Sequence, residues 1–166
     1  MRFSPFRFPE PDILSSVRLV PLLAAALFAG CALAPAPVEP SKPDPTSEAW
    51  YGQAADQLAA LSREAETLLQ SGNPDRAAAI ITQAQPLMNR LLSVAHPTLA
   101  AMEAASDIDQ LYGRMLLSNQ NYGWGRLLFQ KNVARWRYWK PQTEDTVRRR
   151  KLAESGIAEC DRRLAQ

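Results

Sequence analysis

The sequence predicts an all-α domain in which about five helices form antiparallel hairpins. Apolar residues recur at alternating steps of three and four from residue 47 onward, which is the spacing of amphipathic helices. Short segments rich in glycine, asparagine and proline separate these periodic stretches. Nine of the 13 prolines fall within residues 1–46, where no such periodicity is sustained. The 166 residues can fill one modest core, so we expect a single helical domain over residues 47–166.

The first two helices are expected on either side of a turn at Gly72. Ser47 can cap the first helix, and Gly72 can end it in the left-handed conformation. The apolar stripe of this helix consists of Tyr51, Ala54, Leu58, Leu61, Ala65 and Leu68. Asn73 as cap and Pro74 in the first turn suit the start of the second helix. Its stripe consists of Ala77, Ile81, Ala84, Met88 and Leu91. Pro86 lies inside this helix and predicts a kink or a break.

Three further helices are expected in the rest of the chain. His96 and Pro97 are expected to begin the third, with His96 as a cap. Its stripe consists of Leu99, Met102, Ala105, Ile108, Tyr112 and Met115. Residues 118–121 form the next turn. The fourth helix carries Leu128, Phe129, Val133, Trp136 and Trp139. Pro141 closes it, and Thr143 can cap a fifth helix that runs almost to Gln166.

Two segments resemble the tetratricopeptide repeat, a helical hairpin with small residues where its helices approach closely. The first match consists of Ala65, Leu68, Gly72, Ala77, Ile81 and Ala84. The second and looser match consists of Gly113, Leu116, Asn121, Tyr122, Gly125 and Phe129. The copies lie 48 residues apart, whereas tetratricopeptide repeats recur at about 34 residues. The resemblance implies a degenerate, irregular version of that fold, and a generic helical bundle remains the alternative.

Residues 1–30 resemble a secretory signal peptide. Basic residues, the last of them Arg18, precede the mainly apolar run 19–30. This run is shorter than the about 20 apolar residues of a transmembrane helix, so we expect a removable export signal. Acidic residues and prolines before Arg18 are atypical of such a signal. Val17 is therefore an alternative to Met1 as the start of the protein.

The segment 27–31 resembles the lipobox of bacterial lipoproteins, in which a cysteine after two small residues receives a lipid. Ala29 and Gly30 precede Cys31, although Phe28 departs from the leucine preferred three residues before the cysteine. The resemblance implies a lipoprotein that carries diacylglycerol and palmitate on Cys31, its first mature residue. An ordinary signal peptide cut near Ala29 is the alternative.

Residues 31–46 are expected to connect the lipid to the domain. Ala32 after the cysteine implies, within the lipoprotein family, sorting to the cell outer membrane, with the domain in the periplasm. The prolines of this segment predict a semi-rigid extended tether that holds the domain off the membrane. The second cysteine, Cys160, is left without a partner and is expected to be a small buried hydrophobe.

Charge is distributed unevenly along the chain. Residues 39–110 contain ten acids and four bases, and residues 111–166 contain five acids and twelve bases. This asymmetry could steer a charged partner toward the domain. Pairing of acidic with basic helix faces inside one fold is the simpler interpretation.

Aromatic and basic residues are the candidates for partner binding. Trp136 and Trp139 lie one helical turn apart, next to Arg135. Three interpretations stay open for this segment: core tryptophans beside a solvated basic face, a protein-binding groove, or a lipid headgroup site. Tyr122 and Trp124 lie beside glycines at a helix start, which permits close approach of another backbone or a ligand, with packing as the default role.

Signs of catalysis are sparse. His96 is the only histidine, and no cysteine or carboxylate cluster accompanies it at metal-ligand spacing. Glu103 and Asp107 share a helix face, and we expect them to be ordinary solvated acids. We therefore expect no enzyme, no cofactor, no metal and no nucleic-acid partner. The favoured interpretation is a lipid-anchored adaptor or scaffold that binds an envelope protein or peptide. A structural subunit of an envelope complex and an unrecognised cell-wall hydrolase are the alternatives.

Overall fold

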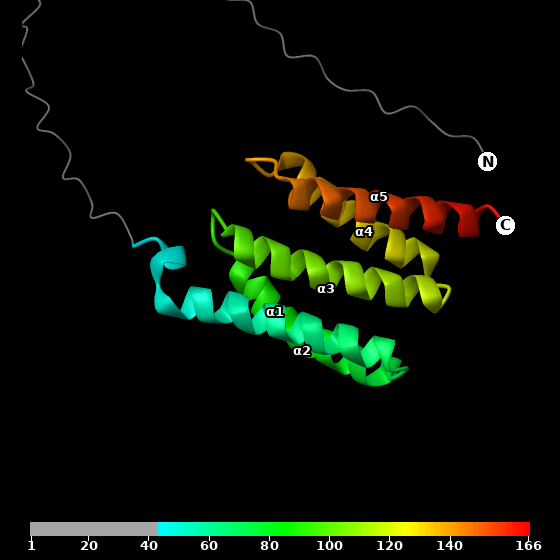
Figure 1. The fold of residues 1–166 in the computed structure, drawn as a ribbon, viewed down its shortest axis with the longest axis horizontal. Helices are drawn as coiled ribbons and strands as arrows, with labels where there is room; N and C mark the ends of the chain where they lie inside the picture. The colour runs from blue at the N-terminus through cyan, green and yellow to red at the C-terminus, as the bar shows by residue number, and fades with distance from the viewer. Residues whose placement is uncertain (1–42) are drawn as a thin grey trace, which may run out of the picture. The chain divides into compact units, whose positions relative to one another are not determined.

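The structure, a computed structural model, describes residues 43–166, which form five α-helices and contain no strand (Figure 1). The elements are the short 3-10 turn η1 (Pro45–Ser47) and the helices α1 (Ala49–Gln70), α2 (Pro74–Leu92), α3 (Leu99–Ser118), α4 (Tyr122–Tyr138) and α5 (Glu144–Leu164). The predicted all-α fold class is confirmed. None of these helices is both long and apolar enough to span a membrane. The predicted signal peptide, Cys31 and most of the tether lie outside the described residues.

The helices pack as two hairpins and a final helix. α1 pairs with α2, and α3 packs against both of them. α3 also pairs with α4 in the second hairpin, and α5 covers α4 and touches α3 (Figure 1). One cluster of buried apolar side chains joins α1, α2 and α3, and a smaller one joins α4 and α5. α3 is therefore the central helix of the bundle.

The two hairpins turn in the same way. In the first turn the backbone N–H of Asn73 donates to the carbonyl oxygen of Leu68 at 2.9 Å, and the second turn repeats this bond 48 residues later at 2.8 Å. Gly72 has a φ of 75°, as predicted, and Gln120 has a φ of 62° at the corresponding place. The 48-residue repetition in the sequence thus corresponds to a repeated hairpin in the structure.

The predicted apolar stripes of α1 and α2 are confirmed, because ten of their eleven residues are buried and the last, Leu68, is half-buried. Two predicted caps are wrong. Ser47 belongs to η1, and its hydroxyl donates to the carbonyl of Asp44 instead of capping α1. Asn73 precedes Pro74 as expected, but its side chain donates to Ser71 and accepts no bond from α2.

The expected break at Pro86 is absent, since α2 continues to Leu92. Pro86 removes one backbone donor from the helix, but it lies on the exposed side of α2. Ala84 and Met88, on either side of it, are buried in the core. Burial along the whole inner face of α2 therefore outweighs the loss of one hydrogen bond.

α3 differs from the prediction at its start and in its stripe. The cap is Thr98, whose hydroxyl oxygen accepts from the N–H of Ala101 at 3.4 Å, while His96 is exposed in the preceding loop. Leu99 and Tyr112 are exposed instead of buried. The buried residues of α3 are Ala101, Ala104, Ala105, Ser106, Ile108, Asp109, Leu111, Gly113 and Met115. They cover more than one face because α3 contacts helices on several sides.

Glycines permit the close packing of the last three helices. The ring of Phe129 lies between Gly113 on α3 and Gly156 on α5, where an added Cβ would come within 2.7 Å of the ring. A Cβ at Gly125 would lie 3.2 Å from the carbonyl oxygen of Gly113, which confirms the close approach predicted there. Cys160 is buried beside this junction as predicted, and burial raises the pKa of its thiol.

The predicted boundary between α4 and α5 is confirmed. α4 ends just before Trp139, and the side-chain amide of Gln142 donates to the carbonyls of Trp136 and Trp139 at 2.7 Å each. Thr143 caps α5 through a capping box with Thr146. Side chains therefore satisfy backbone groups at both helix ends of this connection.

Candidate functional site

Large apolar side chains are exposed where α3 and α4 meet on one side of the second hairpin. Trp124 is 69% exposed and Leu127 is 54% exposed, and Tyr112 on α3 is also exposed. Apolar surface left in water is unfavourable, so a cluster of such side chains is typical of a binding surface.

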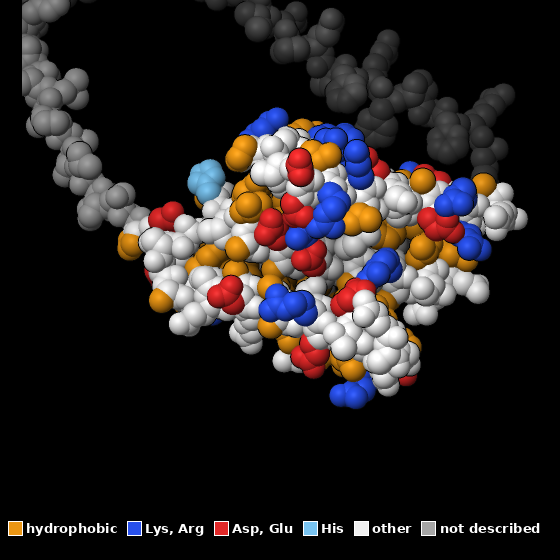
Figure 2. Space-filling model, viewed as in Figure 1, with side chains coloured by type: hydrophobic (Ala, Val, Ile, Leu, Met, Phe, Trp, Pro, Cys, Tyr) orange, Lys and Arg blue, Asp and Glu red, His pale blue; other side chains and the backbone are white. Residues whose placement is uncertain are grey.

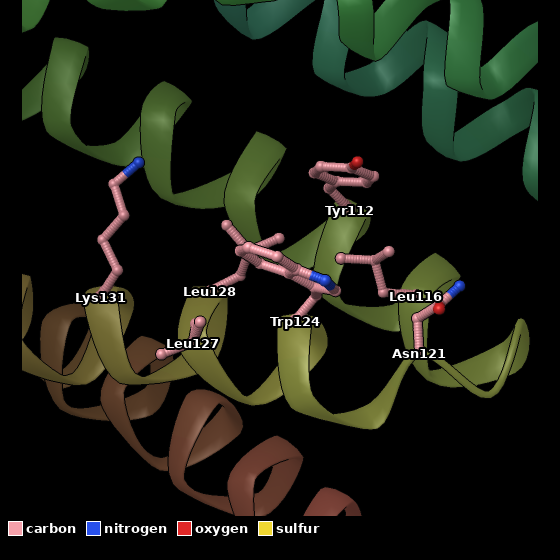
Figure 3. A pocket seen from close by; sticks show the side chains of 7 residues that line it. All are labelled: Tyr112, Leu116, Asn121, Trp124, Leu127, Leu128 and Lys131. Carbon is pink, nitrogen blue, oxygen red and sulfur yellow. The ribbon is translucent and has the colours of Figure 1, made fainter.

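These side chains line a groove of about 580 Å³ between the two helices. Its lining residues are Tyr112, Leu116, Asn121, Trp124, Leu127, Leu128 and Lys131. Figure 3 shows the indole of Trp124 extending across the groove toward Tyr112 and Leu128. A second hollow of about 250 Å³ shares Tyr112, Leu128 and Lys131 with the first and continues it onto α2. We call this continuous surface the α3–α4 groove.

The end of the α3–α4 groove at Lys131 carries charge. The ammonium of Lys131 lies 3.0 Å from a carboxylate oxygen of Asp109, and the guanidinium of Arg135 lies 2.8 Å from the same oxygen. The side chains of Asp109 and Arg135 are almost fully buried, whereas that of Lys131 is partly exposed. One carboxylate shared by two cations leaves a positive charge at this end of the groove.

Hydrogen bonds extend this charged cluster into the interior. Arg135 donates to the side-chain oxygen of Asn132, whose amide nitrogen donates to the carbonyl of Ser106 at 3.0 Å. The indole N–H of Trp136 donates to the hydroxyl of Ser106 at 2.8 Å. We call these residues and Asp109 the buried polar network. Because buried polar groups are costly without partners, the network fixes the position of α4 on α3.

The five residues predicted to bind a partner do not form one surface in the structure. Trp124 lines the groove, but Tyr122 is half-buried against the α4–α5 core. Trp136 is 0% exposed, so a partner cannot contact it, and the core interpretation of this residue is confirmed. Trp139 is half-buried beside Trp136, with ring centroids 6.4 Å apart, and Arg135 belongs to the buried polar network.

Of the seven residues that line the groove, only Trp124 was predicted as a binding residue. Tyr112 and Leu128 were assigned to apolar stripes, Leu116 and Asn121 to the repeat resemblance, and Leu127 and Lys131 were not singled out. A signal was available in the 48-residue repetition. The positions in the first hairpin that correspond to Tyr112, Trp124 and Leu127 are occupied by Glu64, Arg76 and Ala79. Large apolar residues thus replace exposed polar or small ones only in the second hairpin.

A different surface lies between α1 and α3. Glu66 on α1 pairs with Arg114 on α3, and the shallow hollow beside them is lined mainly by polar side chains. Among the described ion pairs, four join the acidic part of the chain to the basic part: Glu66 with Arg114, Asp109 with Lys131 and Arg135, and Asp107 with Arg149. These pairs support internal pairing as one cause of the charge asymmetry.

The side chain of Asp107 is 46% exposed, as expected of a solvated acid, but it is also held in an ion pair. Burial raises the pKa of its carboxyl, and the neighbouring Arg149 partly offsets this effect. Arg149 holds the carboxylate in an ion pair and also pairs with Asp145. Asp107 therefore belongs to the contact between α3 and α5. Within residues 43–166, no group of three or more histidine, cysteine or acidic side chains is placed to hold a metal ion.

The fold and the site define a class: a five-helix protein with two equivalent hairpins, one of which carries an open apolar groove. Comparison of the chain with protein-family models, curated proteins and solved structures found no match.

Proposed function

We propose that this protein is a lipid-anchored cell-envelope adaptor whose helical domain binds another envelope protein or a peptide in the α3–α4 groove. The observation that carries the proposal is the cluster formed by Tyr112, Trp124 and Leu127. The proposed binding function is non-catalytic, and the proposed location at the outer membrane rests on lipid on Cys31 followed by Ala32.

The shape and composition of the groove support a protein or peptide ligand. An exposed tryptophan next to leucines can bury a large apolar area at low entropic cost, and such aromatic residues dominate the energetics of protein interfaces. Lys131 adds one cation at the end of the groove. A peptide that places an apolar side chain against Trp124 and an acidic group near Lys131 would match both features.

The arrangement of exposed apolar residues distinguishes an adaptor from a structural subunit. A permanently bound subunit needs a broad apolar face. Four other large apolar residues are exposed on α3, α4 and α5, and none of them lines the groove: Leu99, Tyr138, Leu152 and Leu164. A local groove with one dominant aromatic residue favours a peptide or a small surface of a partner.

The anchor is tested separately from the groove. Mass spectrometry of the mature protein should find Cys31 as the first residue, carrying diacylglycerol and fatty acid. An unprocessed chain, or a chain that begins elsewhere without lipid, would refute the anchor.

The groove is tested by truncating its central aromatic residue. Trp124→Ala removes a side chain that contributes little to the core because it is 69% exposed. We expect roughly 30-fold weaker binding to partners that cross-link to the wild-type protein in the membrane, as for a hot-spot residue. Arg76→Ala, at the corresponding position of the first hairpin, is the matched control and should leave binding unchanged. Circular dichroism checks the fold of both variants. Intact binding of every partner by Trp124→Ala would refute the groove.

A further inference from the structure

We propose that the connection between α4 and α5 docks onto the anionic lipid headgroups of the membrane that anchors the protein. This inference rests on the proposed lipid anchor. It adds a second contact with the membrane, made by the folded domain itself.

The geometry places this connection at the end of the bundle where the described chain begins. The phenol of Tyr51, near the start of α1, donates to the carbonyl of Leu91 at the end of α2, and the N–H of Thr98 donates to the same phenol. The start of α3 lies in turn beside the end of α4, because Ser106 accepts from Trp136. Pro43 and the α4–α5 connection therefore lie at one end of the bundle, opposite the turns at Gly72 and Gln120 (Figure 1).

The surface of this end combines aromatic and basic side chains. Tyr138 is 77% exposed, and Arg137 and Lys140 on either side of it are exposed as well. Lys151 is exposed on α5. Figure 2 shows basic and hydrophobic side chains together over this part of the domain. Tyrosine beside lysine and arginine is typical of the membrane interface, where the ring lies among headgroups and the cations attract anionic lipid.

The inward side chains of the same segment are already used by the fold. Trp136 and Arg135 are held in the buried polar network, and Arg149 pairs with Asp107 and Asp145. By contrast, Arg137, Lys140 and Lys151 make no ion pair with any described residue.

On the α4–α5 side of this end, two acids, Glu144 and Asp145, offset only part of the charge of five cations, Arg137, Lys140, Arg148, Arg149 and Lys151. Asp145 is paired with Arg148 and Arg149, and Glu144 lies in the first turn of α5. On the neighbouring elements, Asp44 accepts a bond from Thr46, and Glu48 accepts one from Trp50. The carboxylate of Glu103 lies on α3.

The acids of η1 and the start of α1 belong to the side of this end formed by the first hairpin. The aromatic and basic side chains belong to the side formed by α4 and α5. We therefore infer that α4 and α5 face the lipid. Gln142 and the capping box of α5 hold this connection in place, so little order must be gained on docking.

The chain before the domain is long enough for this contact. About 12 residues separate Cys31 from Pro43, and they can span at most about 43 Å. This length limits how far Pro43 can be from the anchor but sets no minimum distance, so the end of the bundle at Pro43 can reach the lipid surface. Docking of the domain would then replace the stand-off from the membrane expected from the proline content.

The test uses the complete lipidated protein in vesicles that contain anionic lipid. Ala134→Cys, one turn before Tyr138 on the exposed side of α4, and Asn119→Cys, at the opposite end of the bundle, each introduce one thiol to which a fluorescent label is attached. Cys160 is buried and should stay unlabelled, which the parent protein checks. Lipids that carry a quencher near the headgroup should quench the label at residue 134 strongly and the label at residue 119 weakly.

A charge variant identifies the lipid chemistry. Arg137→Gln with Lys140→Gln removes two cations that each contribute to binding near an anionic surface, so we expect roughly tenfold weaker docking. Quenching at residue 134 should fall accordingly, and it should also fall in vesicles of neutral lipid. Equal quenching at residues 134 and 119 in a membrane-bound protein would overturn the docking surface and leave the anchor intact. If the natural protein carries no lipid on Cys31 and does not bind vesicles, both the anchor and the docking surface are overturned.

Discussion

The two hairpins have the same turns but different interiors. At four buried positions, the first hairpin has Leu58, Leu61, Ala84 and Met88, and the residues 48 positions later are Ser106, Asp109, Asn132 and Trp136. Aliphatic packing holds α1 to α2, whereas the buried polar network holds α3 to α4.

The difference between the hairpins extends to the surface. Lys131 joins the buried polar network to the α3–α4 groove, because its ammonium contacts Asp109 while its side chain lines the groove. The first hairpin has neither a charged network nor large apolar residues at the corresponding exposed positions. The second hairpin thus combines a polar interior with the apolar groove that we propose as a binding surface, and the first has neither.

The largest effect is expected from Asp109→Leu, which places the leucine of the first hairpin in the buried polar network. Arg135 would lose its carboxylate partner while its side chain is only 5% exposed. Removing one partner of a buried ion pair costs about 3–5 kcal/mol of unfolding free energy. Chemical denaturation measures this loss.

Asp109→Leu with Arg135→Leu makes both positions like the first hairpin, which has Leu61 and Leu87 there. We expect the second change to recover most of the stability, since well-packed apolar residues often replace a buried ion pair without loss. A double variant as unstable as Asp109→Leu alone would contradict the equivalence of the two hairpins.

A smaller effect is expected at a pair of buried positions where the second hairpin combines a smaller residue with a larger one than the first hairpin does. The first hairpin has Ala65 and Ile81, and the second has Gly113 and Phe129 at the same positions. Gly113→Ala would place a methyl group 2.7 Å from the ring of Phe129, which Gly156 confines on its other side. Overpacking of this kind costs about 1–3 kcal/mol.

Thermal unfolding of Gly113→Ala and of the double variant Gly113→Ala with Phe129→Ile tests this exchange. The double variant should regain part of the stability because isoleucine is smaller than phenylalanine. Gly52→Ala is the control, since an added Cβ there meets nothing within 4 Å. It should stabilise α1 by about 0.5–1 kcal/mol. Gly113→Ala as stable as wild type would mean that Phe129 can move away.

The turns provide a reciprocal pair of substitutions. Gln120 has a positive φ, which a side chain resists, whereas the first turn has Gly72. Gln120→Gly is expected to stabilise the protein by up to about 1 kcal/mol, and Gly72→Gln to destabilise it by about 1 kcal/mol. Denaturation midpoints of both variants measure the difference. Equal and unchanged midpoints would show that neither turn is under strain.

Asp145, in the second half of the domain, should contribute to the sensitivity of the protein to acid. A hydrogen bond from Arg149 lowers the pKa of Asp145, so the stability that this acid contributes is complete above the usual aspartate pKa. It is lost as the pH falls through the lowered native pKa. Asp145→Asn should therefore flatten the loss of stability in acid. Gln53→Asn, on the exposed face of α1, changes no ionisable group and is the control that should leave the acid profile unchanged. Denaturation measured at several acidic pH values distinguishes the two variants.

The sequence correctly predicted those features of the fold that depend on local patterns. The stripe from Ala77 to Leu91 and the left-handed Gly72 depend on spacing and backbone conformation, and both are confirmed. The cap of α3 and the continuity of α2 at Pro86 depend on contacts between helices. The predicted cap differs from the structure, and of the predicted kink or break at Pro86 the break is absent. Propensity alone cannot weigh one lost hydrogen bond against burial along a whole helix.

The site was harder to predict than the fold. Periodicity assigned Tyr112 to the core, but α3 contacts several helices, so its stripe does not identify the exposed side. The role of Asp109 depends on Arg135, 26 residues later, and no spacing rule connects them. Trp124 was identified from its glycine neighbours. Comparison of positions 48 residues apart would have shown the change from Glu64, Arg76 and Ala79 to large apolar residues.

Photo-cross-linking in the native membrane compares the same exposed surface on the two hairpins. A photoreactive amino acid is placed at Leu127 in one protein and at Ala79, the corresponding exposed position of the first hairpin, in another. The proposed groove predicts a discrete cross-linked partner from residue 127 that disappears with Trp124→Ala, and no such product from residue 79. The same partner from both positions, or a product from residue 127 that persists with Trp124→Ala, would contradict it.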